Sequence, residues 1–147
     1  MQVREILETK PTAAVVTIGP DQLVAEAVQA LCRCRIGALL VVNESGEPVG
    51  IITERDVLRQ ANQNAAGFGK QPISEMMTRE LICGLPDDNV DYIMQVMTHN
   101  KIRHLPIVED RKVVGLISIG DVIKSQLDIT RVENHMLKDY LHLRGDI

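Results

Sequence analysis

Two stretches of the chain place a hydroxyl and a carboxylate at the same spacing. In GIITERDVL, the opening glycine is followed three positions later by Thr53 and six positions later by Asp56. In GLISIGDVI, the same positions hold Ser118 and Asp121. A hydroxyl residue followed three positions later by an acid is typical of a capping box, in which each side chain binds the other residue's backbone N–H group at a helix start.

The same arrangement can also bind a nucleotide. The free N–H groups at a helix start attract phosphate oxygens. A carboxylate one turn into the helix can accept two hydrogen bonds from the cis-diol of a ribose. The pattern therefore predicts helix caps, a nucleotide-binding site, or both.

The second copy of the pattern is accompanied by basic side chains that the first lacks. Arg103 and His104 stand where the first copy has Gly37 and Ala38. Cationic donors therefore stand in one copy and small residues in the other. The alternative is that Arg103 and His104 lie at a solvated strand end or cap the carbonyl groups of the neighbouring helix. One histidine in isolation says little about which of these holds.

These residues belong to a longer internal repeat. Residues 20–42 align with residues 86–108 without a gap, and seven of these 23 pairs are identical. Beyond them the second copy is one residue shorter, at a predicted turn, where a folded unit tolerates such a change best. The chain therefore contains two copies of one structural unit.

Each copy is predicted to fold as strand, helix, strand, strand and helix, an α/β (α+β) unit. Asp21 and Asp87 are expected to cap the first helices, and the last helices are expected to follow Thr53 and Ser118. A three-stranded sheet with helices on one face buries too little surface alone, so the two copies should pack together. The expected first strands, first helices and second strands lie at residues 14–18 and 81–85, 22–34 and 88–100, and 39–43 and 105–109.

The segments between and around the copies set the expected domain boundaries. ANQNAAGFGKQP contains the Gly, Asn and Pro typical of a connector, and a short helix at residues 3–7 or 73–77 is expected to open each copy. The expected divisions are residues 1–62 for the first repeat, 63–72 for the connector, 73–127 for the second repeat and 128–147 for a long C-terminal helical extension.

The repeated unit resembles a tandem pair of cystathionine-beta-synthase (CBS) domains. The likeness rests on RIGALLVV, VGIITERDVL, RHLPIVE and VGLISIGDVIK and covers about residues 3–125. The tail is similar to that of small stand-alone bacterial proteins of this family. The resemblance implies a pseudo-two-fold sandwich of the two repeats, with two clefts that bind adenosine-containing ligands such as AMP, ADP, ATP, NAD or S-adenosylmethionine.

The resemblance also implies roles for residues in a main cleft. Asp121 would hold the ribose diol, and Ser118 and the helix start at Gly120 would face the ribose or phosphate. Arg103 and His104 would pair with phosphate, which makes the cationic S-adenosylmethionine the less favoured ligand. The adenine would lie against the strand starts of the first copy, near Ala14, Val15, Val16, Ile36, Gly37 and Ala38.

A second cleft would be related to the main cleft by the pseudo-two-fold axis. Thr53 and Asp56 would take the places of Ser118 and Asp121, with Arg55 nearby. This cleft is expected to be less well equipped, because two large side chains would face the adenine where the main cleft has small residues. The other residues implied for it are Leu81, Ile82, Cys83 and Pro106.

The tail, DVIKSQLDITRVENHMLKDYLHLRGDI, continues the last helix with a narrow apolar stripe. The stripe could pack against its own chain or against a second copy, and the pattern leaves both open. The resemblance favours a homodimer, because paired modules of this family commonly associate as discs of two chains. The stripe consists of Val122, Ile129, Val132, Met136, Tyr140 and Leu143.

Composition argues against several classes of protein. The 16 basic and 20 acidic residues give a net charge of −4, and the chain has no Trp, so we expect no nucleic-acid partner. No stretch approaches the roughly 20 apolar residues of a membrane span, and the first residues lack the apolar core of a secretory signal, so a cytoplasmic location without membrane contact is expected.

Cys32, Cys34 and Cys83 form no CxxC pair and are expected to be buried and reduced.

Two functional classes remain open. The sequence contains no legible nucleophile, metal centre or P-loop, since GFGK lacks the required spacing, so we expect neither an enzyme nor a catalytic cofactor. The first class is a regulatory module for energy or redox sensing, which binds an adenine nucleotide and modulates an unidentified effector protein. The second is a purely structural interaction module, in which Asp56 and Asp121 are only helix caps.

Overall fold

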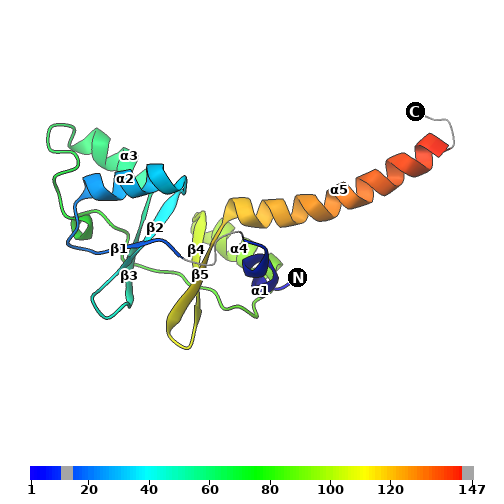
Figure 1. Ribbon diagram of the computed structural model, residues 1–147, viewed down its shortest axis with the longest axis horizontal. Helices are drawn as coiled ribbons and strands as arrows, with labels where there is room; N and C mark the ends of the chain where they lie inside the picture. The colour runs from blue at the N-terminus through cyan, green and yellow to red at the C-terminus, as the bar shows by residue number, and fades with distance from the viewer. Residues whose placement is uncertain (11–14, 144–147) are drawn as a thin grey trace.

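The computed structural model describes residues 1–10 and 15–143, except for the side chains of residues 128–133 and 140–143. Figure 1 shows two small lobes side by side, with the last helix, α5, extending away from them. Ala14 lies outside the described residues. Within the described part of the chain, no helix is both long enough and apolar enough to cross a membrane.

The first lobe contains a three-stranded sheet in the order β1-β2-β3. β1 runs parallel to β2, and β2 runs antiparallel to β3 with Ala38 opposite Thr53. This register places the strand start that follows α2 beside the start of α3. The elements of the lobe are β1 (Thr17–Ile18), α2 (Val24–Cys34), β2 (Ala38–Val42), β3 (Pro48–Thr53) and α3 (Glu54–Gln63).

The second lobe repeats this order around an antiparallel pair of strands. His104 lies opposite Ser118, as Ala38 lies opposite Thr53 in the first lobe. The predicted order of helix, two strands and helix is therefore confirmed in both copies. The elements of the lobe are α4 (Val90–Asn100), β4 (His104–Glu109), β5 (Lys112–Ser118) and α5 (Ile119–Leu143).

The first strand of the second copy was predicted wrongly. In place of a strand at residues 81–85, Gly84 alone forms a parallel bridge with Ile107. A Cβ at Gly84 would lie 2.9 Å from the Ile93 side chain, so the backbone comes close to the core at this one point. Pro86, two residues after Gly84, has no N–H group and so cannot continue the hydrogen-bond ladder of a strand. In the first copy, β1 is also shorter than predicted.

The short opening helices are exchanged between the two lobes. The N-terminal helix α1 (Val3–Thr9) places Val3 and Ile6 in the core of the second lobe. The 3-10 helix η1 (Ile73–Glu75) places Ile73 in the core of the first. Neither copy completes its core with its own residues, so the pair is the folding unit.

Matching backbone hydrogen bonds hold the two exchanged helices. Val3 N–H donates to Asp88 O and Val90 N–H donates to Met1 O, both at 2.9 Å. In the first lobe the corresponding bonds join Ile73 to Gln22 at 2.8 Å and Val24 to Gln71 at 2.9 Å. As a result, α1 packs in the second lobe, although β1, the next element described, belongs to the sheet of the first.

The predicted helix caps Asp21 and Asp87 were wrong. α4 begins with Asn89 as its N-cap, and the Asn89 side chain accepts the N–H of Asp91 at 2.8 Å. α2 has Leu23 as its N-cap. Both helices therefore begin later than predicted, at the residues that bond to the exchanged helices. Asp87 instead forms an ion pair with Arg4 of α1 at 2.9 Å.

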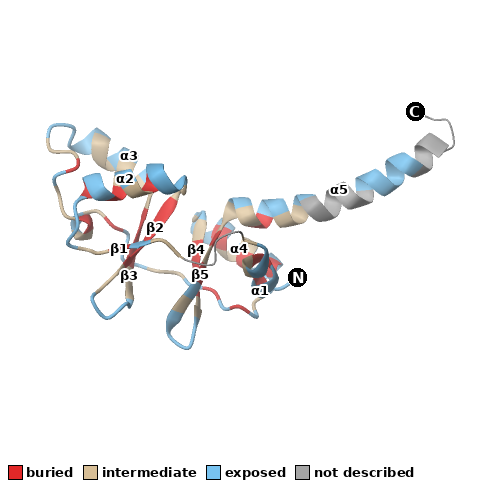
Figure 2. Cartoon of the chain, in the orientation of Figure 1, coloured by how far each residue is buried: buried red, intermediate tan, exposed pale blue. Residues whose placement is uncertain are grey.

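Figure 2 shows buried residues on the strands and on the inner faces of α1, α2 and α4. The three cysteines were expected to be buried, but all three are exposed. Ala27 and Leu31 occupy the buried face of α2, which leaves Cys32 and Cys34 on its outer side.

The apolar residues of α5 fall into two groups. Val122 is buried in the second-lobe core, whereas Ile123, Leu127, Met136 and Leu137 are between 46% and 67% exposed. The predicted stripe is thus packed at Val122 and exposed at Met136. The side chains of its other members, Ile129, Val132, Tyr140 and Leu143, lie outside the described residues.

Candidate functional site

Both repeated motifs form helix caps, as their spacing predicted. Thr53 Oγ1 accepts the N–H of Asp56 at 3.3 Å, and Asp56 Oδ2 accepts the N–H of Thr53 at 3.0 Å. In the second lobe, Ser118 Oγ accepts the N–H of Asp121 at 3.1 Å, and Asp121 Oδ2 accepts the N–H of Ser118 at 2.9 Å. Each carboxylate is therefore held in one orientation at the start of its helix.

The first N–H group of each of these helices is also bonded. Glu54 N–H donates to Gly37 O at 3.1 Å, and Ile119 N–H donates to Arg103 O at 2.7 Å. These bonds join each helix start to the strand start beside it. Because two N–H groups at each helix start already have acceptors, recognition of an anion here must depend largely on side chains.

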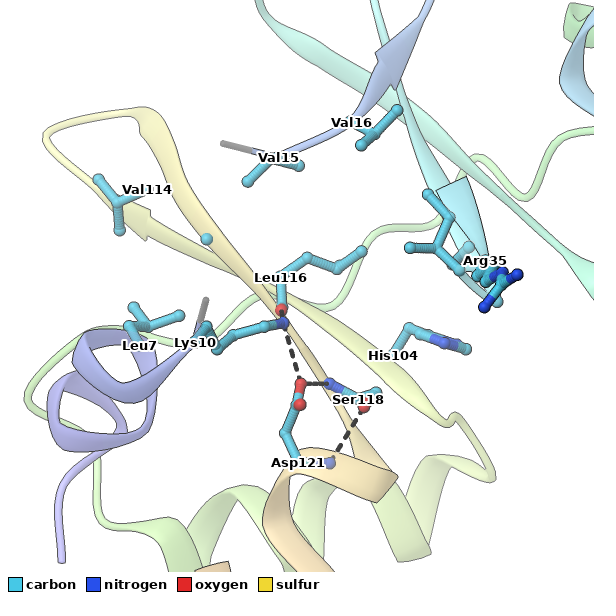
Figure 3. Close-up of a pocket in the computed structure, with 14 residues that line it drawn as sticks. Leu7, Lys10, Val15, Val16, Arg35, His104, Val114, Leu116, Ser118 and Asp121 are labelled. Carbon is cyan, nitrogen blue, oxygen red and sulfur yellow. Dashed lines mark hydrogen bonds and ion pairs between the residues drawn. The ribbon is translucent and has the colours of Figure 1, made fainter. Parts of the chain in front are cut away.

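A first cavity of about 480 Å³ lies between the lobes, on the side of Asp121. Figure 3 shows Val15 and Val16 on one side of it and Asp121 across from them, with Lys10 and Arg35 also facing the space. The cavity combines apolar walls from both lobes with a polar end. Its lining consists of Leu7, Lys10, Val15, Val16, Arg35, Ile36, Gly37, Ala38, His104, Val114, Gly115, Leu116, Ser118 and Asp121.

Most residues predicted for the main cleft line this first cavity, but Arg103 and Gly120 do not. Both line the second cavity instead. Arg103 lies just before β4 and lines only the second of the two cavities, whereas His104, the first residue of β4, lines both. The residues brought together as predicted are Val15, Val16, Ile36, Gly37, Ala38, His104, Ser118 and Asp121.

A second cavity of about 550 Å³ lies on the side of Asp56. Thr53, Arg55 and Asp56 line it as predicted. Leu81, Ile82, Cys83 and Pro106 are all described residues, and they line neither cavity. Leu81, Ile82 and Cys83 were expected in a strand, but the structure retains only the bridge at Gly84, whose N–H donates to Pro106 O at 2.9 Å.

The second cavity is lined by more basic side chains than the first. Arg55, Arg59, Lys101 and Arg103 line it, whereas Lys10 and Arg35 are the lysine and arginine that line the first. The expectation that the second cleft is less well equipped concerned the room left for the adenine beside Arg103 and His104, both of which line the second cavity, and it stays a prediction.

Arg35 and Lys101 occupy equivalent places in the two cavities. Each is the C-cap of a helix and has a left-handed backbone, with φ of 53° and 55°. The following N–H groups, of Ile36 and Ile102, donate to Leu31 O and Met97 O at 3.2 and 3.0 Å, which ends both helices in the same way. The sequence reasoning missed Arg35, although a basic residue at the same aligned position in both copies could have revealed it.

An ion pair between Lys10 and Asp121 forms the polar end of the first cavity (Figure 3). Lys10 Nζ lies 3.0 Å from Asp121 Oδ2 and donates to Leu116 O at 2.6 Å. Sequence reasoning missed Lys10 because its partner lies 111 positions away. Only the exchange of α1 onto the second lobe brings the two together.

Asp121 is charged in the folded protein at neutral pH. Burial raises the pKa of Asp121, but the Ser118 N–H and the Lys10 ammonium together outweigh burial, so the pKa lies below its ordinary value. Both donors bind Oδ2. Among the described residues, Oδ1 has no donor, so this oxygen of a charged carboxylate remains available to a ligand.

His104 lies between the two cavities and lines both. Burial lowers the pKa of His104, and the neighbouring Glu54 only partly opposes this, so the imidazole is neutral at pH 7. A Cβ at Gly37 would lie 3.1 Å from His104 Nε2 and 3.4 Å from Glu54 Oε1. Glycine at this position therefore leaves the space that the imidazole occupies.

Comparisons with known proteins agree with this arrangement. The family model of the CBS domain matches twice, over residues 3–62 and 73–128. The CBS domain-containing protein CBSX3, mitochondrial, of Arabidopsis thaliana is 37% identical over 125 residues, which cover 82% of this chain and 61% of the Arabidopsis protein. This chain thus spans less than two thirds of that relative.

Two solved structures extend the comparison to the fold and to ligands. The CBS-domain containing protein ATU1752 from Agrobacterium tumefaciens has a TM-score of 0.82 and 35% identity, over 85% of this chain and 92% of that one. The CBS domain pair of protein MJ0100, in complex with 5′-methylthioadenosine and S-adenosyl-L-methionine, has a TM-score of 0.75 and 32% identity, over 84% and 98% of the two chains.

Proposed function

Because this chain belongs to the CBS domain family, with two copies of the domain, we propose that it is a regulatory module that binds an adenine nucleotide, such as AMP, ADP, ATP or NAD. The observation that carries the proposal is the charged carboxylate of Asp121, which is held through Oδ2 by Ser118 and Lys10 and lines the first cavity. A carboxylate oxygen so placed is the acceptor that a ribose hydroxyl needs.

The first cavity suits the other parts of a nucleotide. Its volume of about 480 Å³ lies within the range of about 300–1,000 Å³ that is usual for small-molecule sites. Val16, Ile36 and Ala38 offer apolar contacts for the adenine, while Arg35 and Lys10 offer cationic donors for phosphate. In this arrangement the phosphate is bound by Arg35 and Lys10 rather than by Arg103.

The MJ0100 structure supports an adenosyl ligand as the class. The two molecules in that complex share an adenosine unit, which is the part that Asp121 and the apolar wall would bind here. The basic residues Lys10 and Arg35 favour a phosphorylated member of the class over the sulfonium cation of S-adenosylmethionine.

A ligand in the first cavity would contact both lobes and the exchanged helix. It would favour the arrangement of lobes in which these contacts are all made, and an effector protein on a separate chain would respond to that shift. We propose that the module acts in this way, as a homodimer and without catalysis. The exposed apolar residues of α5, such as Met136 and Leu137, are consistent with a protein contact.

A purely structural interaction module is the second candidate. The observation that favours it is that both motifs form complete helix caps without any ligand. In that case Asp56 and Asp121 would serve only helix stability, worth about 1 kcal/mol each.

Thermal unfolding with a panel of nucleotides distinguishes the two candidates. A ligand at about a hundred times its dissociation constant adds about 2.7 kcal/mol to the free energy of unfolding. We expect at least one of AMP, ADP, ATP and NAD to raise the Tm, and the guanine counterparts GMP, GDP and GTP to raise it less. If no adenine nucleotide raises the Tm, the structural module is correct.

A further inference from the structure

Lys10 reaches the first cavity from the end of α1 (Figure 3). We propose that Lys10 determines which ligand charge the first cavity accepts, selecting a phosphate-bearing adenosyl ligand over a cationic one. This inference rests on the proposed function, and it assigns the selectivity to one residue outside both repeated motifs.

The balance of charges in the cavity supports this role. Lys10 and Arg35 are cationic, Asp121 is anionic, and His104 is neutral at pH 7. The described lining thus carries one more positive than negative charge. Without Lys10 the charges of Arg35 and Asp121 would balance, and the carboxylate would attract a cationic ligand.

The geometry of the ammonium group allows Lys10 to contact a ligand directly. An ammonium has three N–H donors, and Lys10 uses one on Leu116 O and one on Asp121 Oδ2. A third donor is left for a ligand oxygen. Because Lys10 binds Oδ2, it also fixes the carboxylate while Oδ1 stays available for the ribose.

The second cavity lacks this feature. Ile51, the equivalent of Leu116, accepts the backbone N–H of Thr78 at 2.9 Å in place of an ammonium. Among the residues whose side chains are described, Asp56 pairs only with Arg59, whose Nη1 lies 4.0 Å from Oδ1 and whose side chain is 61% exposed. The two cavities therefore differ in the cation that is paired with the carboxylate. We expect a lysine to select the charge of the ligand only in the first cavity.

The test uses three ligands that share adenosine and differ in charge: AMP, which is anionic, 5′-methylthioadenosine, which is neutral, and S-adenosylmethionine, which carries a sulfonium. Their dissociation constants are measured by titration calorimetry for the full chain, Lys10→Met and Lys10→Arg. All three proteins also carry Asp56→Asn, which weakens ligand binding in the second cavity. Lys10→Met should raise the dissociation constant of AMP about tenfold, the size expected for the loss of a hydrogen bond to a charged group. The same change should lower the dissociation constant of S-adenosylmethionine and alter that of 5′-methylthioadenosine by less than about threefold.

Two controls separate charge selection from a structural role. Lys10→Arg keeps the charge and should keep the preference for AMP. Lys112→Met removes the same charge from an exposed site outside both cavities and should leave the three constants unchanged.

The possible failures are distinguishable. If Lys10→Met weakens all three ligands equally, Lys10 only supports the site, and the inference is wrong while the proposed function stands. If the unmodified chain binds none of the three, the proposed function falls and this inference falls with it.

Discussion

Lys10 Nζ lies 3.0 Å from Asp121 Oδ2, although the two residues are 111 positions apart in the chain. The ion pair exists because α1 packs into the core of the second lobe. Lys10, the C-cap of α1, therefore lies beside Asp121 at the start of α5. The exchange that makes the two repeats one folding unit thus also places a cation in the first cavity.

Acid should weaken this ion pair. The pKa of Asp121 is lowered in the folded protein, so its contribution to the free energy of unfolding is complete above the ordinary Asp range and is lost as pH falls through the folded pKa. The pair is partly exposed, so we expect a loss on the order of 1 kcal/mol. Urea unfolding from pH 6 to pH 3 should show a steeper loss for the wild type than for Asp121→Asn, and equal slopes would contradict the assignment.

His104 should make the protein less stable in mild acid. Burial lowers its pKa below the ordinary value of 6.5, so the unfolded chain binds a proton more readily than the folded one, and stability falls as pH drops from about 7 through the folded pKa. His104→Gln removes this titration. Between pH 7 and pH 5 the wild type should lose more free energy of unfolding than His104→Gln does. A larger loss in the variant would rule out a neutral buried imidazole.

Two glycines give a matched pair of substitutions. Gly37→Ala places a Cβ 3.1 Å from His104 Nε2 and should destabilise the protein by about 1–3 kcal/mol, the usual cost of overpacking. Gly120→Ala meets Ser118 Oγ at an ordinary 3.5 Å and lies in a helix, where alanine is the better residue. Its free energy of unfolding should be unchanged or slightly higher. Equal effects of the two changes would show that His104 does not need the space at Gly37.

The exchange of the opening helices can be tested by hydrogen exchange. Ile6 is 4% exposed in the core of the second lobe, and Ile6→Ala should cost about 2–5 kcal/mol. The amides of α4 should lose protection first, since they pack on α1. If the amides of α2 lose protection before those of α4, α1 packs on its own repeat and the account of the fold is wrong.

The sequence allowed the elements within each copy to be predicted well. Short apolar runs before a polar turn located β2 and β4, and the repeated motifs located the starts of α3 and α5 with their caps. These features depend on contacts within about 20 positions of the chain. Asp21 and Asp87 failed as caps because bonds from the exchanged helices decide where α2 and α4 begin.

The site was harder to predict than the elements. Alignment of the copies shows which residues are equivalent, but not which lobe each crossing segment reaches, so Lys10 was missed. Arg103 was expected beside His104 in the main cleft, but it lies just before β4 and lines the second cavity. Cys32 and Cys34 were predicted to be buried because cysteine is usually a buried residue type. Their positions on α2 lie outside its buried face, and both are exposed.

Direct titration of AMP, ADP, ATP and NAD into the wild type, Asp121→Asn and Asp56→Asn tests the central claim most directly. We predict that at least one nucleotide binds the wild type, that Asp121→Asn weakens its binding at least about tenfold, and that Asp56→Asn leaves the tighter site within about threefold of the wild type. The account is contradicted if no nucleotide binds the wild type, or if Asp121→Asn binds as tightly as the wild type does.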